Sequence, residues 1–117
     1  MPQEHWRVRL GAGAERDFAN ILRWTRKNFG APQARLYRET ITLAIRELAQ
    51  GPDLRGSKRR DDIMQGLRML HVARHGRRGR HLLLYRVLDP SVIEIGRILH
   101  DSMDVQRHPL FDNDDIA

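Results

Sequence analysis

Two long amphipathic segments separated by only a few residues dominate the first half of this 117-residue chain. From Ala14 to Phe29, apolar residues recur three or four positions apart, which indicates a helix with one apolar face. Gly30 suits the position after a helix, and Pro32 suits the first turn of a second helix that we expect to end at Gly51. Helices joined by so short a connection must pack antiparallel, so the sequence predicts a helical hairpin.

The other regular segments resemble strands. Trp6 to Leu10 alternates apolar and basic side chains, which is typical of a short strand at a sheet edge. Residues 67–74, 80–88 and 92–99 are joined by short turns and predict an antiparallel meander, whereas residues 53–62 read as a surface loop. The predicted fold class is α+β: an N-terminal strand and an antiparallel helical hairpin packed on one face of a small antiparallel sheet, completed by a three-strand meander.

The middle strand of this meander, residues 81–88, is apolar on both faces. Such a pattern is typical of a central strand covered on both sides. Because one small domain supplies only one helix layer, we expect the second face to form a shallow groove or to meet a partner chain. Residues 1–117 form a single domain in this interpretation, with an acidic C-terminal tail at about residues 101–117.

Charge is unevenly distributed along the chain. Lysine and arginine number 21 against 15 acidic residues, and the net charge of +6 makes an anionic partner worth considering. Residues 55–86 carry 10 basic and 2 acidic side chains, whereas residues 87–117 carry 2 and 7. We therefore expect the basic middle stretch to mark where partners dock.

Cysteine and long apolar runs are both absent from the sequence. The lack of cysteine excludes disulfides and thiolate metal sites and fits a reducing cytoplasm. Without a signal-like N-terminus or an apolar run of about 18 residues, we expect neither export nor a membrane span.

Several arginines are candidates for binding. The turn that bears Arg77 and Arg78 can present guanidinium groups to a phosphate or an acidic helix, or it can simply protect the sheet edge. Arg97 is expected to share an apolar face with Ile93, Ile95 and Leu99, so it needs a carboxylate, a carbonyl or an open groove. A structural ion pair with Glu94, Asp101 or Asp104 is the alternative. The candidate binding residues are Arg74, Arg77, Arg78, Arg86, Arg97, His100, Met103 and Asp104.

The six histidines do not predict a metal site, because His71 falls in a strand and His75 in a turn, so their rings do not converge. His100 and the acidic residues after it can form an acid–base cluster, or His100 can fix the chain end by bonding a local carboxylate. No nucleophile elbow or phosphate-binding glycine loop is present, so we expect neither an autonomous metabolic enzyme nor a cofactor.

This order of elements resembles the ParE/RelE toxin superfamily of bacterial type II toxin–antitoxin systems, and the residues resemble its ParE branch. The resemblance extends from about Trp6 to Pro109, and its most specific part is Ile98-Leu99-His100 followed by Met103-Asp104. The other matching positions are Trp6, Gly11-Ala12, Asp17 to Trp24, Gly30, Gln33-Ala34, Tyr37, Gly66-Leu67-Arg68 and Tyr85-Arg86-Val87.

The ParE resemblance implies a non-enzymatic toxin that inhibits DNA gyrase and acts in plasmid stabilization. It also implies a ParD-like antitoxin, in a heterodimer or heterotetramer, whose helical tail covers a groove beside the sheet. Direct contact with DNA is left open.

The RelE branch implies a different activity, ribosome-dependent cleavage of mRNA. Its candidate catalytic residues here would be Arg74, Tyr85, Arg97 and His100, although the chain lacks that branch's lysine-rich helix. A degenerate toxin that only binds its antitoxin is a third hypothesis.

Overall fold

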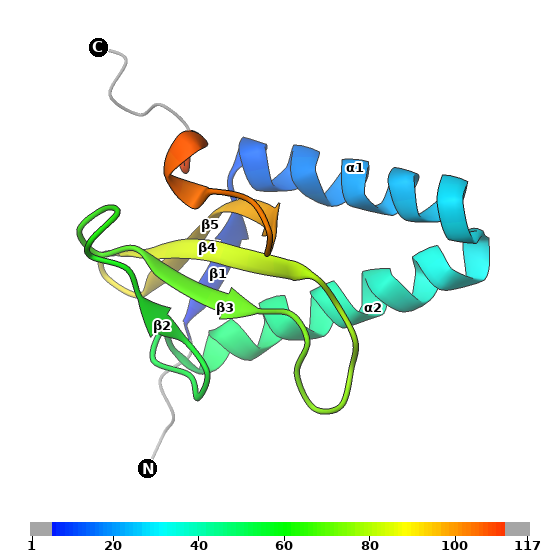
Figure 1. The fold of residues 1–117 in the computed structure, drawn as a ribbon. Helices are drawn as coiled ribbons and strands as arrows, with labels where there is room; N and C mark the ends of the chain where they lie inside the picture. Colours follow the sequence, from blue (N-terminus) through cyan, green and yellow to red (C-terminus); the bar gives the residue numbers. More distant parts are fainter. Residues whose placement is uncertain (1–5, 112–117) are drawn as a thin grey trace.

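The structure, a computed structural model, describes residues 6–111 as two helices packed on a five-stranded sheet (Figure 1). The elements are β1 (Arg7–Leu10), α1 (Ala12–Phe29), α2 (Ala31–Glu47), the 3₁₀ turn η1 (Leu48–Gln50), β2 (Lys58–Arg59), β3 (Arg68–His71), β4 (His81–Leu88), β5 (Val92–His100) and the 3₁₀ turn η2 (Val105–Arg107). The α+β fold class predicted from the sequence is confirmed.

The strand order in the sheet is β1-β5-β4-β3-β2. Strands β3, β4 and β5 form the predicted antiparallel meander. Strand β1, however, pairs parallel with β5, with Val8 opposite Ile93, so the sheet is mixed. A parallel neighbour requires a long crossover, and the helical hairpin supplies it. Strand β2 adds a two-residue edge inside the segment that we expected to be a loop.

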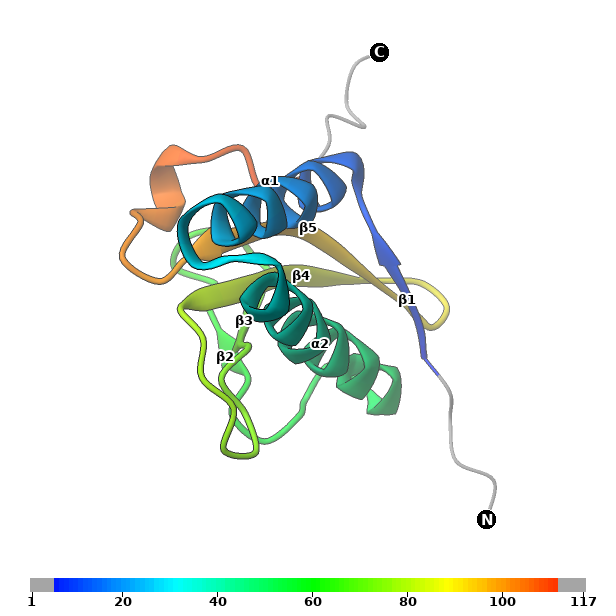
Figure 2. The same cartoon turned by 90° about the vertical axis from the view of Figure 1, so that its right-hand side faces the viewer.

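The two helices form the predicted hairpin, and Figure 2 shows it from the end where α1 turns into α2. Gly30 ends α1 with a backbone φ of 95°, and its N–H donates to the carbonyl of Arg26. The α-helical part of α2 ends at Glu47, because the chain tightens into η1 before it reaches Gly51. None of the described helices is long and apolar enough to cross a membrane.

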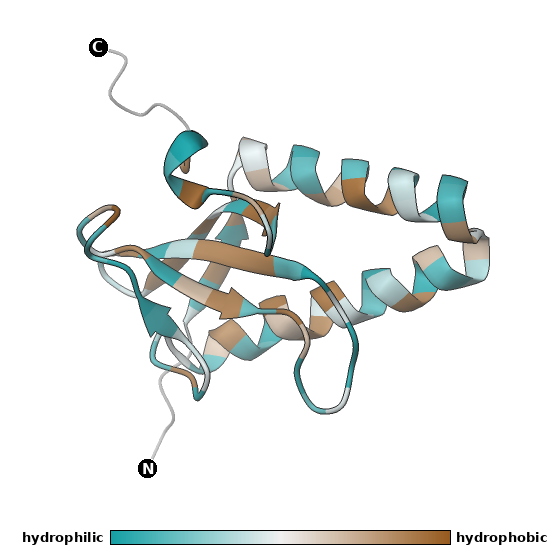
Figure 3. Ribbon diagram, in the orientation of Figure 1, coloured by the Kyte–Doolittle hydropathy of each residue, from teal (hydrophilic) through white to brown (hydrophobic). Residues whose placement is uncertain are grey.

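The main core lies between the hairpin and one face of the sheet. Apolar residues are concentrated on the central strands β3 and β4 (Figure 3). The fully buried side chains of this core include Ala14, Ile41, Leu48, Leu70, Leu83, Tyr85, Ile93 and Ile95. Burial of this apolar surface is what holds the helices against the strands.

A second, smaller core covers the opposite face of the sheet, and it contradicts our expectation of an open groove or partner chain there. Leu84 and Leu99 pack against Leu67 and against two residues of the C-terminal segment, Val105 and Leu110. The segment that we expected to be an acidic tail therefore folds back as far as Phe111. The rest of that tail lies outside the described residues.

A β-bulge at Gly96 explains how the segment packs so closely. Leu84 is opposite Arg97 and Tyr85 is opposite Ile95, which leaves Gly96 as an extra residue. The prediction that Arg97 shares a face with Ile95 is therefore wrong, because the bulge shifts the alternation. A Cβ atom at Gly96 would overlap the Leu110 carbonyl oxygen, so glycine is required for this approach.

Candidate functional site

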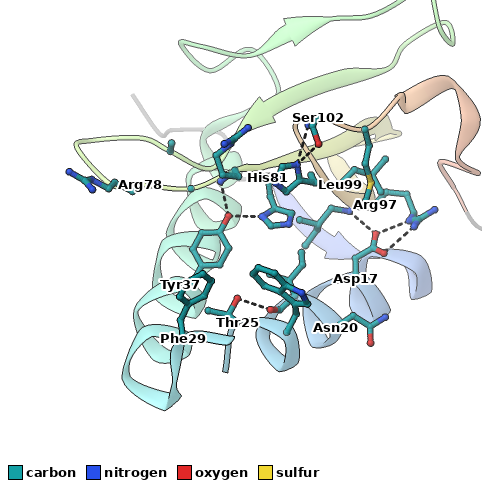
Figure 4. Close-up of a pocket in the computed structure, with 18 of the residues that line it drawn as sticks. Asp17, Asn20, Thr25, Phe29, Tyr37, Arg78, His81, Arg97, Leu99 and Ser102 are labelled. Carbon is teal, nitrogen blue, oxygen red and sulfur yellow. Dashed lines mark hydrogen bonds and ion pairs between the residues drawn. The ribbon is translucent and has the colours of Figure 1, made fainter. Parts of the chain in front are cut away.

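An open groove of about 1320 Å³ lies between the helical hairpin and the end of the sheet where β4 begins (Figure 4). Trp24 and Phe29 from α1 line it, and their ring centroids are 5.6 Å apart. These side chains are 59% and 65% exposed, and Met103 in the same groove is 46% exposed. Large apolar side chains are normally covered, so this groove has the character of a binding site.

A tyrosine and two histidines lie together along the groove. The Tyr37 hydroxyl accepts a hydrogen bond from the Arg80 backbone N–H at 3.0 Å and lies 2.6 Å from His81 Nδ1. With that oxygen accepting from Arg80, the Tyr37 hydroxyl donates to a neutral His81 ring. The His81 and His100 ring centroids are 5.3 Å apart.

Burial keeps this pair uncharged at neutral pH. Burial, and secondarily the nearby His100, lowers the pKa of His81 to about 4. Burial also raises the pKa of Tyr37. The groove therefore presents neutral hydrogen-bonding groups at this point.

Arg97 crosses from β5 to α1 at the rim of the groove. Its Nε and Nη2 atoms donate to the two Asp17 carboxylate oxygens at 2.7 and 3.0 Å, and its Nη1 donates to the Pro109 carbonyl at 2.9 Å. Asp17 also accepts the Ile98 backbone N–H at 2.8 Å. The carboxylate partner of Arg97 is thus Asp17 on α1, and not one of the nearby residues Glu94, Asp101 and Asp104 that we considered from the sequence.

Asp101 lies just beyond β5 and holds the neighbouring basic groups. Arg80 donates to both of its carboxylate oxygens, and His71 lies 3.0 Å away. Hydrogen bonds from Arg80, and then from His71, hold the pKa of Asp101 below its usual range. His100 Nδ1 bonds the Ser102 hydroxyl at 2.7 Å, and the local carboxylate that we expected, that of Asp101, lies 3.6 Å from the same atom.

The family model for the ParE toxin of type II toxin–antitoxin system, parDE, matches residues 8–105. The chain belongs to the ParE toxin family. Toxin ParE1 of Mycobacterium tuberculosis is 32% identical over 102 residues, which cover 87% of this chain and 96% of that toxin.

Solved structures agree with this family at the level of the fold. The chromosomal ParDE TA system from P. aeruginosa gives a TM-score of 0.69 at 18% identity, covering 83% of this chain and 97% of that one. The toxin–antitoxin complex RelBE2 from Mycobacterium tuberculosis gives a TM-score of 0.53 at 26% identity, covering 82% of this chain and 98% of that one.

In this ParE-family toxin, the groove gathers some of the candidate residues named from the sequence. Arg77, Arg78, Arg97, His100 and Met103 line it. Arg77 is also anchored, because its Nη2 donates to Glu39 at 2.8 Å. Arg78 forms no hydrogen bond or ion pair within residues 6–111.

Three other candidates lie elsewhere. Arg74 is held outside the groove by Glu47, with a 2.9 Å hydrogen bond. Arg86 pairs with Glu94 beside the second core, and its guanidinium lies 4.2 Å from the centroid of the Phe111 ring. Asp104 caps η2 by accepting the Gln106 backbone N–H.

Tyr85, a candidate only for the nuclease hypothesis, is completely buried and donates to the Pro52 carbonyl at 2.8 Å. It cannot reach a substrate. Of the four nuclease candidates, therefore, only Arg97 and His100 line the groove. The tyrosine in the groove is Tyr37, which we named from the sequence as a matching position of the family but not as a candidate site residue. The described residues contain no group of three or more side chains suited to hold a metal ion.

Proposed function

We propose that this toxin of a type II toxin–antitoxin system inhibits DNA gyrase in the cytoplasm and is neutralised by a ParD-like antitoxin. The protein is a ParE-family toxin by its match over residues 8–105. The similar toxin of Mycobacterium tuberculosis also bears the ParE name. From this family membership we expect gyrase as the target, a ParD-like antitoxin and a role in plasmid stabilization.

One observation supports gyrase over RNA cleavage as the basis of toxicity. The nuclease hypothesis, with the residues named from the sequence, needs Arg74, Tyr85, Arg97 and His100 in one accessible site, because proton transfer requires contact with the substrate. Tyr85 is buried, and Arg74 is tied to Glu47 outside the groove. A non-enzymatic poison needs a complementary surface and no such convergence.

A supercoiling assay tests this target. We expect purified toxin in molar excess to inhibit gyrase and to increase the amount of cleaved DNA bound to the enzyme. Addition of the antitoxin should restore supercoiling. Unchanged gyrase activity at toxin excess would overturn gyrase as the target. Unhindered growth of cells that express the toxin without antitoxin would favour the degenerate-toxin hypothesis.

The groove is the proposed seat of the antitoxin tail. Its exposed apolar side chains suit the apolar face of an amphipathic helix, and Arg77 and Arg78 at its edge suit acidic residues. We expect Phe29→Ala to weaken antitoxin binding at least about tenfold, as for a typical buried anchor.

Leu36→Ala is the matched control for this binding measurement, because Leu36 is 51% exposed but does not line the groove. Titration calorimetry with the antitoxin's C-terminal peptide compares the two variants. Equal losses of affinity would place the antitoxin on another surface. Arg97→Ala should also weaken the complex. Arg86→Ala should have little effect on it, because Arg86 does not line the groove.

RNA cleavage is a second candidate because Tyr37, His81, His100 and Arg97 line one groove. Two imidazoles and a guanidinium are suitable groups for general acid–base cleavage of a phosphodiester. Primer extension on translated messages should show cuts in cells that produce the toxin, and His100→Gln should abolish them. Intact messages together with a DNA-damage response would exclude this candidate.

A further inference from the structure

The tip of the helical hairpin is strongly basic, and its charge is not neutralised by the rest of the described chain. The last turns of α1 and the first turns of α2 carry five basic residues, which we call the basic tip: Arg23, Arg26, Lys27, Arg35 and Arg38. All five side chains belong to exposed residues, and none forms an ion pair within residues 6–111. Only Arg23 is engaged, through a hydrogen bond to the Asn20 amide oxygen.

No carboxylate lies near these cations in the sequence. Residues 18–38 contain neither aspartate nor glutamate. The flanking carboxylates, Asp17 and Glu39, pair with Arg97 on β5 and with Arg77 in the turn before β4. These two carboxylates are thus engaged by other parts of the chain, and the tip is left with uncompensated positive charge.

This distribution differs from the one that the sequence predicted. Residues 55–86 have the highest basic excess, but seven of their ten basic side chains form ion pairs in the structure. These seven are Arg59, Arg60, Arg68, Arg74, Arg77, Arg80 and Arg86. The free positive charge therefore concentrates on the hairpin tip instead of the middle stretch.

We propose that the basic tip binds the phosphate backbone of double-stranded DNA. Along either helix, its five cations lie within about 12 Å of the connection at Gly30. A DNA duplex presents about one phosphate charge per 1.7 Å of its axis, or roughly six in 10 Å. The charge density of the tip therefore matches that of a duplex.

The rigidity of the tip favours a duplex over a single strand. The backbone positions that carry its cations are fixed on two packed helices, so they form a preorganised array that suits regularly spaced phosphates. A single strand would instead be held by stacking of its bases on exposed aromatic rings. The rings near the tip, Trp24 and Phe29, contact each other and line the groove assigned above to the antitoxin.

This inference rests on the proposed function in one respect, because the DNA held by gyrase is what the tip would meet. Contact with that DNA would help to hold the toxin at the enzyme–DNA complex. The binding assay below contains no gyrase, so failure to bind DNA and failure to inhibit gyrase are separate results.

The test is fluorescence anisotropy with a short labelled DNA duplex, using the full chain and two variants of equal charge. The tip variant carries Arg23→Gln, Lys27→Gln and Arg38→Gln, and glutamine keeps a good helix propensity. The control variant carries Arg7→Gln, Arg55→Gln and Lys58→Gln, which are exposed and form no ion pair within the described residues but lie off the hairpin. Both variants lose three charges.

For about four phosphate contacts, the affinity of the unmodified toxin should fall on the order of a hundredfold between about 50 and about 200 mM salt. The tip variant should lose at least about tenfold in affinity, and its salt slope should decrease by about two to three. The control should change less than about threefold.

Equal losses in both variants would overturn the proposal, because net charge alone would then explain binding. The absence of any binding at low salt would also overturn it. Tighter binding to a single strand or to an RNA duplex of the same sequence would assign the tip to that ligand instead.

Discussion

Among single residues, Arg68 has a surprising environment. Its Nε and Nη1 atoms are buried without a hydrogen-bond partner in the described residues. Its one ion pair, with the exposed Asp53, has an N–O distance of 3.4 Å. A buried guanidinium with so few hydrogen bonds and ion pairs has a desolvation cost that its contacts do not offset.

Replacing Arg68 by methionine should therefore leave the free energy of unfolding within about 1 kcal/mol of its original value, or raise it. Arg74→Met is the contrasting variant, because Arg74 bonds both Glu47 and the Arg55 carbonyl. It should lower that free energy by about 1–3 kcal/mol. Urea denaturation measures both, and a larger loss for Arg68→Met would mean that the guanidinium is satisfied in solution.

His81 makes stability depend on pH. Its pKa in the folded protein is about 4, against about 6.5 for an unfolded chain. Between these values the unfolded state binds more protons, so the free energy of unfolding falls as pH decreases through this window. Above pH 6.5 the contribution of the neutral His81 ring to that free energy is fully present. The loss should reach up to about 3 kcal/mol, because each tenfold difference between the acid dissociation constants of the folded and unfolded states is worth about 1.4 kcal/mol. A protonated ring would also lose the hydrogen bond that Nδ1 accepts from Tyr37.

Four charged or titratable groups near His81 modulate this effect. His100 and His71 disfavour its protonation, and Asp101 and Asp17 favour it. We expect His81→Gln to flatten the stability curve between pH 4 and 6.5, measured as the denaturation midpoint against pH. His75→Gln, which lies outside the groove, should keep the slope. An unchanged slope in His81→Gln would assign the pH dependence to another group.

Among the elements, α1 is joined to β5 by one carboxylate in addition to the apolar core. Asp17 accepts two hydrogen bonds from Arg97 and a third from the Ile98 backbone N–H. Strand β1 has already ended at this height of the sheet, so Asp17 satisfies a backbone donor that no strand covers.

Asp17→Asn should therefore lower the free energy of unfolding by about 2–4 kcal/mol, because it removes the charge partner of a partly buried guanidinium. Glu15→Gln is the control on the same helix, since Glu15 is exposed and forms no ion pair within residues 6–111. Chemical denaturation should show a change below about 0.5 kcal/mol for it. Similar losses in both variants would argue against this role of Asp17.

Local patterns predicted the elements well, and non-local contacts account for what they missed. The helices and meander strands follow from periodicity and turn residues within a few positions of each other. The parallel partner of β1 and the bond from Arg97 to Asp17 join residues about 80 positions apart, which no local pattern encodes. The bulge at Gly96 likewise becomes visible only when both strands are paired.

The candidate site shows the same limit. Arg97, His100 and Met103, which we grouped from the sequence, line one groove because they are close together in the chain. Tyr37 and His81 were missed because only the packing of α2 against β4 brings the hydroxyl to the imidazole. Charge counting could not show which cations are paired for a related reason, since ion pairs such as Arg74–Glu47 and Arg77–Glu39 form between segments that were counted separately.

For the molecule as a whole, the C-terminal segment is part of the folded unit. A chain that ends at Asp104 would lose Val105 and Leu110 and expose Leu84 and Leu99. Two buried aliphatic side chains contribute about 1.5–3 kcal/mol each, so the free energy of unfolding should fall by at least about 3 kcal/mol. The exposed apolar face should also bind the dye ANS.

A chain that ends at Phe111 keeps every member of the second core and is the control for this truncation. Its thermal midpoint and dye binding should match those of the full chain. If the shorter chain also matched them, the second core would contribute little to stability.

The pairing of β1 with β5 has a consequence for how the toxin is made. Strand β1 is synthesised first, but Val8 can pair with Ile93 only when most of the chain has left the ribosome. The groove wall from Arg97 to Met103 is made later still. A nascent or prematurely terminated chain therefore lacks the completed groove, which forms only after the last strand is released.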